Sequence, residues 1–269
     1  MLYTLYRISD KGNPKRKLQH ADKFYCLNNY IKVFGKENLV VFADNCYEET
    51  LNSIRSLGIK LIELPGLGNA LSFIAVLDHA LKHFSDDDTV YFLEDDYLHL
   101  KNAETVLNEG LAVADYVTLY DNPDKYFDFK NSGYNHFIIR GGEETKVFLT
   151  LSSHWRITNS TTMTFATHIK ILKEDYQIWK FFKTQDYQAF QKLAGHPLRI
   201  SDDICVLKNK LKDVPLIGIN GVKQRLKTIY HYYKNKLHRP KRKLIVSIPG
   251  NSTHVETDFL SPLINWNNI

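Results

Sequence analysis

The chain has 269 residues, which is long for one small module and short for two ordinary domains, so we expect one large domain. Hydrophobic residues make up 43% and charged residues 24%, a balance that excludes wholesale disorder. The three cysteines show no CxxC spacing, which argues against a disulfide framework and a cysteine-built zinc site. With no apolar run of about 18 residues and no signal-peptide pattern, we expect a protein of the reducing cytoplasm.

In the first hundred residues, strand-like and helix-like patterns alternate. Apolar, β-rich runs predict strands, and apolar residues repeated every three or four positions predict helices. The predicted strands are 2–8, 39–43, 59–64 and 89–93, and the predicted helices lie around 24–34, 51–57 and 70–84, with Asn69 as an N-cap. Strands separated by helices in this order indicate an α/β fold with a doubly wound, mainly parallel sheet and helices on both faces.

Beyond residue 100 the pattern is less regular. The predicted helices are 103–112, 169–182 and 186–193, and the predicted strands are 116–119, 138–139, 146–151, 154–166 and 244–248. No repeat and no linker rich in Gly and Ser divides the chain. We therefore expect a single domain over 1–269.

Polar side chains follow each of the first four predicted strands. They are Arg7, Ser9 and Asp10, then Asp44 and Asn45, then Gly66, Gly68 and Asn69, and finally Glu94, Asp95 and Asp96. Ligands of open parallel sheets bind outside the carboxyl ends of the strands, so we expect these residues at one site. The sequence contains no GxxxxGK[ST], which excludes a P-loop NTPase, and no GxGxxG after the first strand, which argues against a dinucleotide site.

Three consecutive carboxylates at the end of an apolar strand need a physical explanation, because they repel one another when ionised. A divalent cation with oxygen ligands removes this repulsion, and Mg²⁺ or Mn²⁺ bridging to a diphosphate is a common use of such acids. A solvated acidic turn is the alternative. The position of the run at the end of the fourth strand favours the metal site.

The run VYFLEDD at 90–96 resembles the strand and DxD-like motif of GT-A-fold glycosyltransferases. Segments 6–10 and 42–45 look like the nucleotide-binding half of that fold, and IPGNSTHVE at 248–256 is similar to a C-terminal segment of its bacterial-type members. The resemblance covers essentially the whole chain, although the motif begins with Glu instead of Asp. It implies a GT-A-like, Rossmann-like fold with a nucleotide-binding half over 1–100 and an acceptor-binding half over 101–269.

The resemblance also implies a function. We expect a metal-dependent, inverting glycosyltransferase of polysaccharide biosynthesis, using Mn²⁺ or Mg²⁺. It would move a sugar from a nucleoside-diphosphate sugar to a glycan or lipid-linked acceptor. Asp96 would coordinate the metal, and His254 would bind the metal or the diphosphate. The residues assigned to the nucleotide sugar are Arg7, Ser9, Asp44, Asn69, Glu94 and Asp95, of which Glu94 or Asp95 would contact the ribose or a metal-bound water.

Several of these assignments have structural alternatives. Asp44 could cap the turn before Glu48, Arg7 could pair with Asp10, and His254 could be an ordinary histidine.

On the acceptor side, an inverting transfer needs a carboxylate that deprotonates the acceptor hydroxyl. Asp186, at the start of a predicted helix, is the first candidate for this base, and Asp202 is the second. Trp155 and Arg156 could provide an apolar platform and hydrogen bonds for the acceptor sugar, with a core Trp as the alternative.

A block of cations without acids lies between Asp213 and Glu256, and its arm over 223–243 interleaves aromatics with Lys and Arg. We favour a solvent-exposed basic arm on the acceptor side, and we keep peripheral contact with an anionic membrane and a flap over the donor phosphates as alternatives. We expect no nucleic-acid partner.

Two other classes of function stay open. A nucleotidyltransferase acting on sugar phosphates would also combine a parallel sheet, a metal and a nucleotide, but its Gly-rich basic loop is a poor match to 9–17. A nucleic-acid-binding module would use the basic block and would leave the three carboxylates unexplained.

Overall fold

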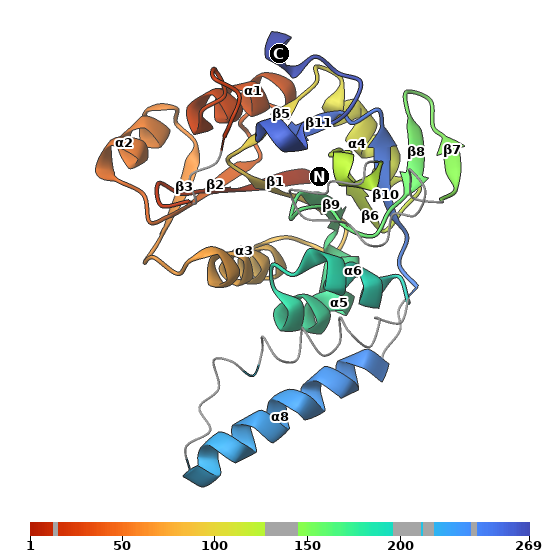
Figure 1. Ribbon diagram of the computed structural model, residues 1–269. Helices are drawn as coiled ribbons and strands as arrows, with labels where there is room; N and C mark the ends of the chain where they lie inside the picture. Colours follow the sequence, from red (N-terminus) through yellow and green to blue (C-terminus); the bar gives the residue numbers. More distant parts are fainter. Residues whose placement is uncertain (13–15, 127–144, 196–210, 212–217, 238–240) are drawn as a thin grey trace.

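The computed structural model describes residues 1–12, 16–126, 145–195, 211, 218–237 and 241–269 (Figure 1). A mixed sheet with the strand order β3-β2-β1-β4-β9-β6-β10-β8-β7 forms the centre. Its strands are β1 (Leu2–Ile8), β2 (Leu39–Asp44), β3 (Lys60–Leu64), β4 (Thr89–Glu94), β6 (Tyr116–Thr118), β7 (Val147–Leu149), β8 (His154–Ile157), β9 (Phe165–His168) and β10 (Leu244–Ile248). In this described sheet only β8 and β9 run against the other strands, so it is mainly parallel.

Helices cover both faces of the sheet (Figure 1). One face carries α1 (Lys23–Phe34), α2 (Glu48–Ser56) and α4 (Ala103–Leu111), and the other carries α3 (Asn69–His83), α5 (Ile169–Phe182) and α6 (Asp186–Leu193). A small second sheet pairs β5 (Tyr97–His99) with β11 (Ser252–His254), and α8 (Gly218–Leu237) projects from the body below α5. Short 3₁₀ turns complete the described elements at Pro123–Lys125, Thr257–Phe259 and Trp266–Asn268.

The apolar runs of the sequence form strands because both faces of the sheet are buried. Along β4, Val90 and Phe92 pack into the core beside α3 and α5, whereas Tyr91 and Leu93 pack into the core beside α1 and α4. Successive side chains of a strand point to opposite faces, so a strand between two helical layers is apolar at every position. This pattern confirms the α/β fold class expected from the sequence.

The predicted strand over 154–166 is wrong. The structure divides it into β8 and β9, which lie on opposite sides of the pair formed by β6 and β10. Thr162 and Met163 adopt positive φ values of 51° and 62°, a left-handed conformation that ends an extended chain. Alternating apolar and Thr residues suggested one strand, since periodicity does not reveal such a turn. The predicted strand at 138–139 lies outside the described residues.

The C-terminal end of the basic arm belongs to the body of the protein. Asp175 on α5 is fully buried, and its carboxylate accepts hydrogen bonds from Arg242 Nε (2.8 Å), Arg242 Nη2 (3.1 Å) and the Tyr116 hydroxyl (2.8 Å). The Lys243 N–H donates to Asp115 at 2.7 Å. Arg242 therefore fastens the start of β10 to α5, and it is not part of a solvent-exposed arm.

We predict that Arg242→Met lowers the free energy of unfolding by on the order of 3 kcal/mol, because it leaves the Asp175 charge buried without its cation. Lys241→Met is the matched control, since Lys241 is the exposed neighbour and its loss should change stability by less than about 0.5 kcal/mol. Urea unfolding followed by circular dichroism measures both. Equal stability of the two variants would contradict the role given to Arg242.

Candidate functional site

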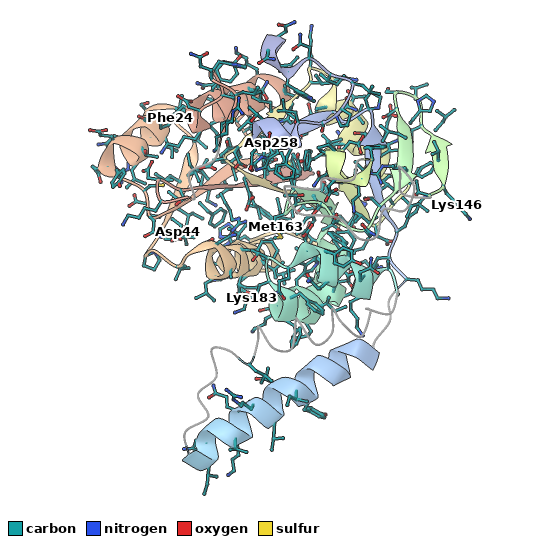
Figure 2. All side chains as sticks on the ribbon, in the orientation of Figure 1. Phe24, Asp44, Lys146, Met163, Lys183 and Asp258 are labelled. Atoms are coloured by element: carbon teal, nitrogen blue, oxygen red, sulfur yellow. The ribbon has the colours of Figure 1, made fainter. Side chains whose placement is uncertain are left out.

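A polar cleft of about 640 Å³ opens at the carboxyl ends of β1, β2 and β4. Figure 2 labels Asp44 at this end of the sheet, beside the connection to α3. The lining includes all six residues assigned to the nucleotide sugar and the first metal candidate: Arg7, Ser9, Asp44, Asn69, Glu94, Asp95 and Asp96. Residues at the carboxyl ends of β1, β2 and β4, together with Asn69 after β3, thus share one cleft, as the rule for parallel sheets predicts.

Arg7 connects three elements at the floor of the cleft. Its guanidinium donates to the backbone and side-chain oxygens of Asn69, both at 2.9 Å, and to Ser72 Oγ at 3.1 Å, and it forms an ion pair with Glu94. Arg7 does not pair with Asp10. Asn69 is not the N-cap of α3 either: Gly68 occupies that position, and the Asn69 side chain accepts from Arg7 instead. The Arg7–Glu94 pair therefore orients the first turn of α3.

Asp44 holds the loop between β3 and α3. Its two carboxylate oxygens accept from the N–H groups of Leu67 and Gly68, each at 2.7 Å. The loop turns through Gly66 and Gly68, which have φ values of 81° and 75° that side chains disfavour. The turn before Glu48 is held by Asp10, which accepts from the Tyr47 N–H at 2.6 Å, so the alternative of Asp44 as its cap is wrong.

Asp95 and Asp96 place two carboxylates side by side at the end of β4. Burial and the charge of Asp96 raise the pKa of Asp95 to about 7, although its Oδ2 accepts from the Ser9 N–H at 3.0 Å. Asp96 Oδ2 lies 3.1 Å from His254 Nε2 and 3.7 Å from Lys17 Nζ. The repulsion expected from the sequence is therefore present, and two groups from distant segments approach one of the acids.

The contacts of His254 define which ring nitrogen carries its proton. Nδ1 accepts from the Glu256 backbone N–H at 3.1 Å, so the proton of the neutral ring is on Nε2 and points to Asp96. A metal ligand needs a lone pair at the ligating atom, and Nε2 has none in this tautomer. As described here, His254 acts as a hydrogen-bond donor in the site, so its assignment to the metal is not supported by these contacts.

The C-terminal segment contacts Asp96, although none of its described residues lines the cleft. β11 pairs with β5, which sets His254 opposite Tyr97, and the Val255 N–H donates to the Asp96 carbonyl at 2.9 Å. The Leu18 N–H in turn donates to Val255 at 2.9 Å, which brings Lys17 to the cleft. Lys17 was missed in the assignment of site residues. The run of cations at 15–17 was the available signal in the sequence, but it did not indicate that the backbone of Leu18 bonds to Val255 in the C-terminal segment.

Asp186, the first candidate base, does not line the cleft and lies one loop away from it. Its Oδ2 accepts from the N–H groups of Thr161 and Thr162, each at 2.7 Å. The Thr162 carbonyl also accepts from the Tyr97 hydroxyl at 3.0 Å, and Tyr97 follows Asp96 directly. Asp186 therefore holds the loop at 161–162, and this loop contacts Tyr97, the residue after Asp96. Asp202 lies outside the described residues.

The acceptor platform expected at Trp155 is wrong. Trp155 is fully buried in the core beside α4, where a Cβ on Gly110 would approach the indole to 2.7 Å, and its N–H donates to Thr150 Oγ1 at 2.8 Å. A sugar platform needs an exposed ring, so this is a core tryptophan. Arg156 is 3% exposed and forms a buried ion pair with Asp121 at 3.0 Å, which likewise leaves its guanidinium away from solvent.

The donor set for a divalent cation is small. Among the described residues, no group of three or more His, Cys, Asp or Glu side chains is arranged to hold a metal. Asp95 and Asp96 offer carboxylate oxygens, and Mg²⁺ often takes only one or two carboxylates when substrate phosphates complete its shell. The pair therefore fits a cation that is shared with a diphosphate and does not fit a site made by protein groups alone.

We predict that Asp95→Asn stabilises the protein at pH 8 by on the order of 2 kcal/mol in the absence of divalent cations. Above pH 7 the folded wild type carries a buried charge at Asp95, whereas the unfolded chain binds a proton there only near pH 4, so wild-type stability falls as the pH rises through this window. Because Asp95 of the unfolded chain ionises above about pH 4, the difference should shrink as the pH is lowered from 8 to 5 and should vanish only below about pH 4. Thermal unfolding at both pH values measures it.

Asp87→Asn is the matched control, because it makes the same chemical change at an exposed carboxyl just before β4. Its stability difference from wild type should be small at both pH values. A gain for Asp95→Asn that is equal at pH 5 and pH 8 would contradict the raised pKa of Asp95.

No protein-family model matches this sequence, and neither does any curated protein. Among solved structures, S. aureus TarS 1–349 is 12% identical, with 87% of this chain and 81% of that chain covered and a TM-score of 0.42. A cytidylyltransferase from Leptospira borgpetersenii is 13% identical, with 68% and 67% covered and a TM-score of 0.40. The galactosyltransferase LgtC, in complex with donor and acceptor sugar analogues, is 12% identical, with 71% and 69% covered and a TM-score of 0.39.

Proposed function

We propose that this protein is a metal-dependent, inverting glycosyltransferase that moves a sugar from a nucleoside-diphosphate sugar to a glycan or lipid-linked acceptor. One observation carries the proposal. The neighbouring carboxylates Asp95 and Asp96 directly follow a buried strand and line the cleft, and Asp96 Oδ2 lies 3.1 Å from His254 Nε2 and 3.7 Å from Lys17 Nζ. Acids and cations gathered in this way are suited to a ligand that carries both a metal ion and phosphates.

The departing nucleoside diphosphate sets the chemical demand on the site, because its negative charge grows as the glycosidic bond breaks. A bound Mn²⁺ or Mg²⁺, held by Asp95 and Asp96, would supply Lewis-acid neutralisation of that charge. Lys17 would add a positive charge on the same side, and His254 Nε2–H would donate to a phosphate oxygen. The tail that positions both residues is thus part of the proposed donor site.

The nucleoside would occupy the part of the cleft between β1 and α3. Arg7 and Glu94 neutralise each other there and present Asn69 and Ser72 along the cleft wall. Asp44 would act on the nucleoside through the loop that it holds, since both of its oxygens already accept from that loop. Ser9 would contribute from the end of β1, where its N–H fixes Asp95.

For the acceptor we keep Asp186 as the proposed base and Asp202 as the second candidate. The two N–H groups on Oδ2 orient the Asp186 carboxylate in the loop next to Tyr97. With Oδ2 held by these two N–H groups, Oδ1 would take the proton of the acceptor hydroxyl while the carboxylate keeps its orientation.

A nucleotidyltransferase acting on sugar phosphates is the second candidate function. The observation that favours it is the position of Lys11 and Lys17, which come from the connection between β1 and α1 and line the cleft. A triphosphate needs more positive charge than a diphosphate sugar does. Release of pyrophosphate from a nucleoside triphosphate and a sugar phosphate would establish this activity. Release of nucleoside diphosphate from nucleotide sugars with Mn²⁺ would instead establish the first.

We predict that Asp96→Ala weakens Mn²⁺-dependent binding of nucleoside diphosphates by at least about tenfold, because it removes one of two carboxylates for the cation. Calorimetric titration of uridine, guanosine, cytidine and thymidine diphosphates with and without Mn²⁺ measures this. Asp87→Ala, at an exposed carboxyl outside the cleft, should bind as the wild type does. A folded Asp96→Ala variant with unchanged Mn²⁺-dependent affinity would sink the site assignment.

We predict that His254→Ala weakens diphosphate binding and that His254→Gln retains most of it. The Gln side chain keeps an N–H that can donate where Nε2–H does, but it is a poor metal ligand. The same calorimetric titration compares the two variants, with their melting temperatures as a control for folding. Equal losses in both variants would instead indicate that His254 ligates the metal.

A further inference from the structure

Helix α8 stands apart from the packed layers of the protein. It projects beyond α5 and away from the sheet (Figure 1). Its inner side approaches α5, and along that side Gly221 is buried and Arg225 and Thr228 are half-buried. Ile229 is also half-buried, whereas Ile219, Val222, Leu226 and Tyr230 are exposed, so this part of α8 presents a face that no described element buries.

That open face is apolar. Ile219, Val222, Leu226 and Tyr230 follow each other at intervals of three and four residues, which places them in one stripe along the helix. Their exposed fractions are 77%, 48%, 60% and 61%. Exposed apolar residues are normal when they are scattered, but a continuous stripe of four on a projecting helix marks an interaction surface.

The charges beside the stripe are all positive. Lys223 and Lys227 are exposed and each follows a stripe residue, so both lie along one border of the stripe. In the sequence, no acidic residue occurs between Asp213 and Glu256. An exposed apolar stripe bordered by lysines is the pattern of helices that lie in the interface of an anionic membrane.

We propose that α8 docks this protein on an anionic lipid surface, with the stripe of Ile219, Val222, Leu226 and Tyr230 inserted at the headgroup level. The lysines beside the stripe favour an anionic lipid surface over a second copy of the chain as the binding partner of α8. Two copies of α8 packed by their stripes would bring lysines together without any acid to pair with, whereas phosphatidylserine headgroups neutralise them. None of the described helices combines the length and apolar character needed to cross a membrane. The inference is independent of the transfer reaction.

Cosedimentation of the full chain with vesicles tests the docking. We expect binding to phosphatidylcholine vesicles that contain about 30 mol% phosphatidylserine and none to pure phosphatidylcholine vesicles. The variant Ile219→Gln/Val222→Gln/Leu226→Gln should bind about tenfold more weakly, since it removes the apolar part of the contact. The variant Lys223→Gln/Lys227→Gln should also bind about tenfold more weakly, since it removes two cations near the surface.

Each variant has a matched control. Val147→Gln/Leu149→Gln/Leu151→Gln removes three other exposed apolar side chains, and Lys32→Gln/Lys101→Gln removes two other exposed cations. Both controls should bind vesicles as the wild type does. Unchanged binding by the α8 variants, equal loss in the controls, or equal binding to neutral vesicles would overturn the proposal. So would a dimer in sedimentation analysis that the α8 apolar variant dissociates, because it would assign the stripe to a second copy.

Discussion

The repulsion between the Asp95 and Asp96 carboxylates is the constraint around which the cleft is built. Two charges held side by side in a partly buried strand end destabilise the folded state unless something neutralises them. The structure partly compensates with the Ser9 N–H, His254 Nε2–H and the ammonium of Lys17. Burial and the charge of Asp96 nevertheless raise the pKa of Asp95 to about 7, so these groups offset the cost only in part. In the function that we propose, a bound divalent cation would offset this cost.

The acids on strand ends differ in what they do, although they look alike in the sequence. Asp44 and Asp10 hold loops through backbone N–H groups, and Glu94 neutralises Arg7. Asp95 and Asp96 instead carry charge that the protein leaves partly unbalanced. Three of the acids at the cleft thus hold protein groups in place, whereas Asp95 and Asp96 are the pair to which we assign the proposed cation.

Much of the fold could be predicted from the sequence because it depends on local patterns. The apolar runs of β1 and β10 and the helical repeat of α5 were sufficient to place those elements, and the strand-end rule gathered the cleft residues. Contacts between distant segments could not be predicted in this way. The burial of Trp155, the approach of Lys17 and the pairing of Arg242 with Asp175 each depend on which segments meet in three dimensions.

The position of β10 has a consequence for how the chain is made. Residues 244–248 are synthesised after all the other described strands of the main sheet, yet β10 lies inside that sheet between β6 and β8. The four strands β3, β2, β1 and β4 can pair during synthesis, but the other half of the sheet stays split until β10 arrives. His254 follows only six residues later. The strands around β1 are therefore made before β10, and the contact of His254 with Asp96 forms only after β10 is made, so nascent chains stopped before residue 244 would hold a sheet that is open between β6 and β8.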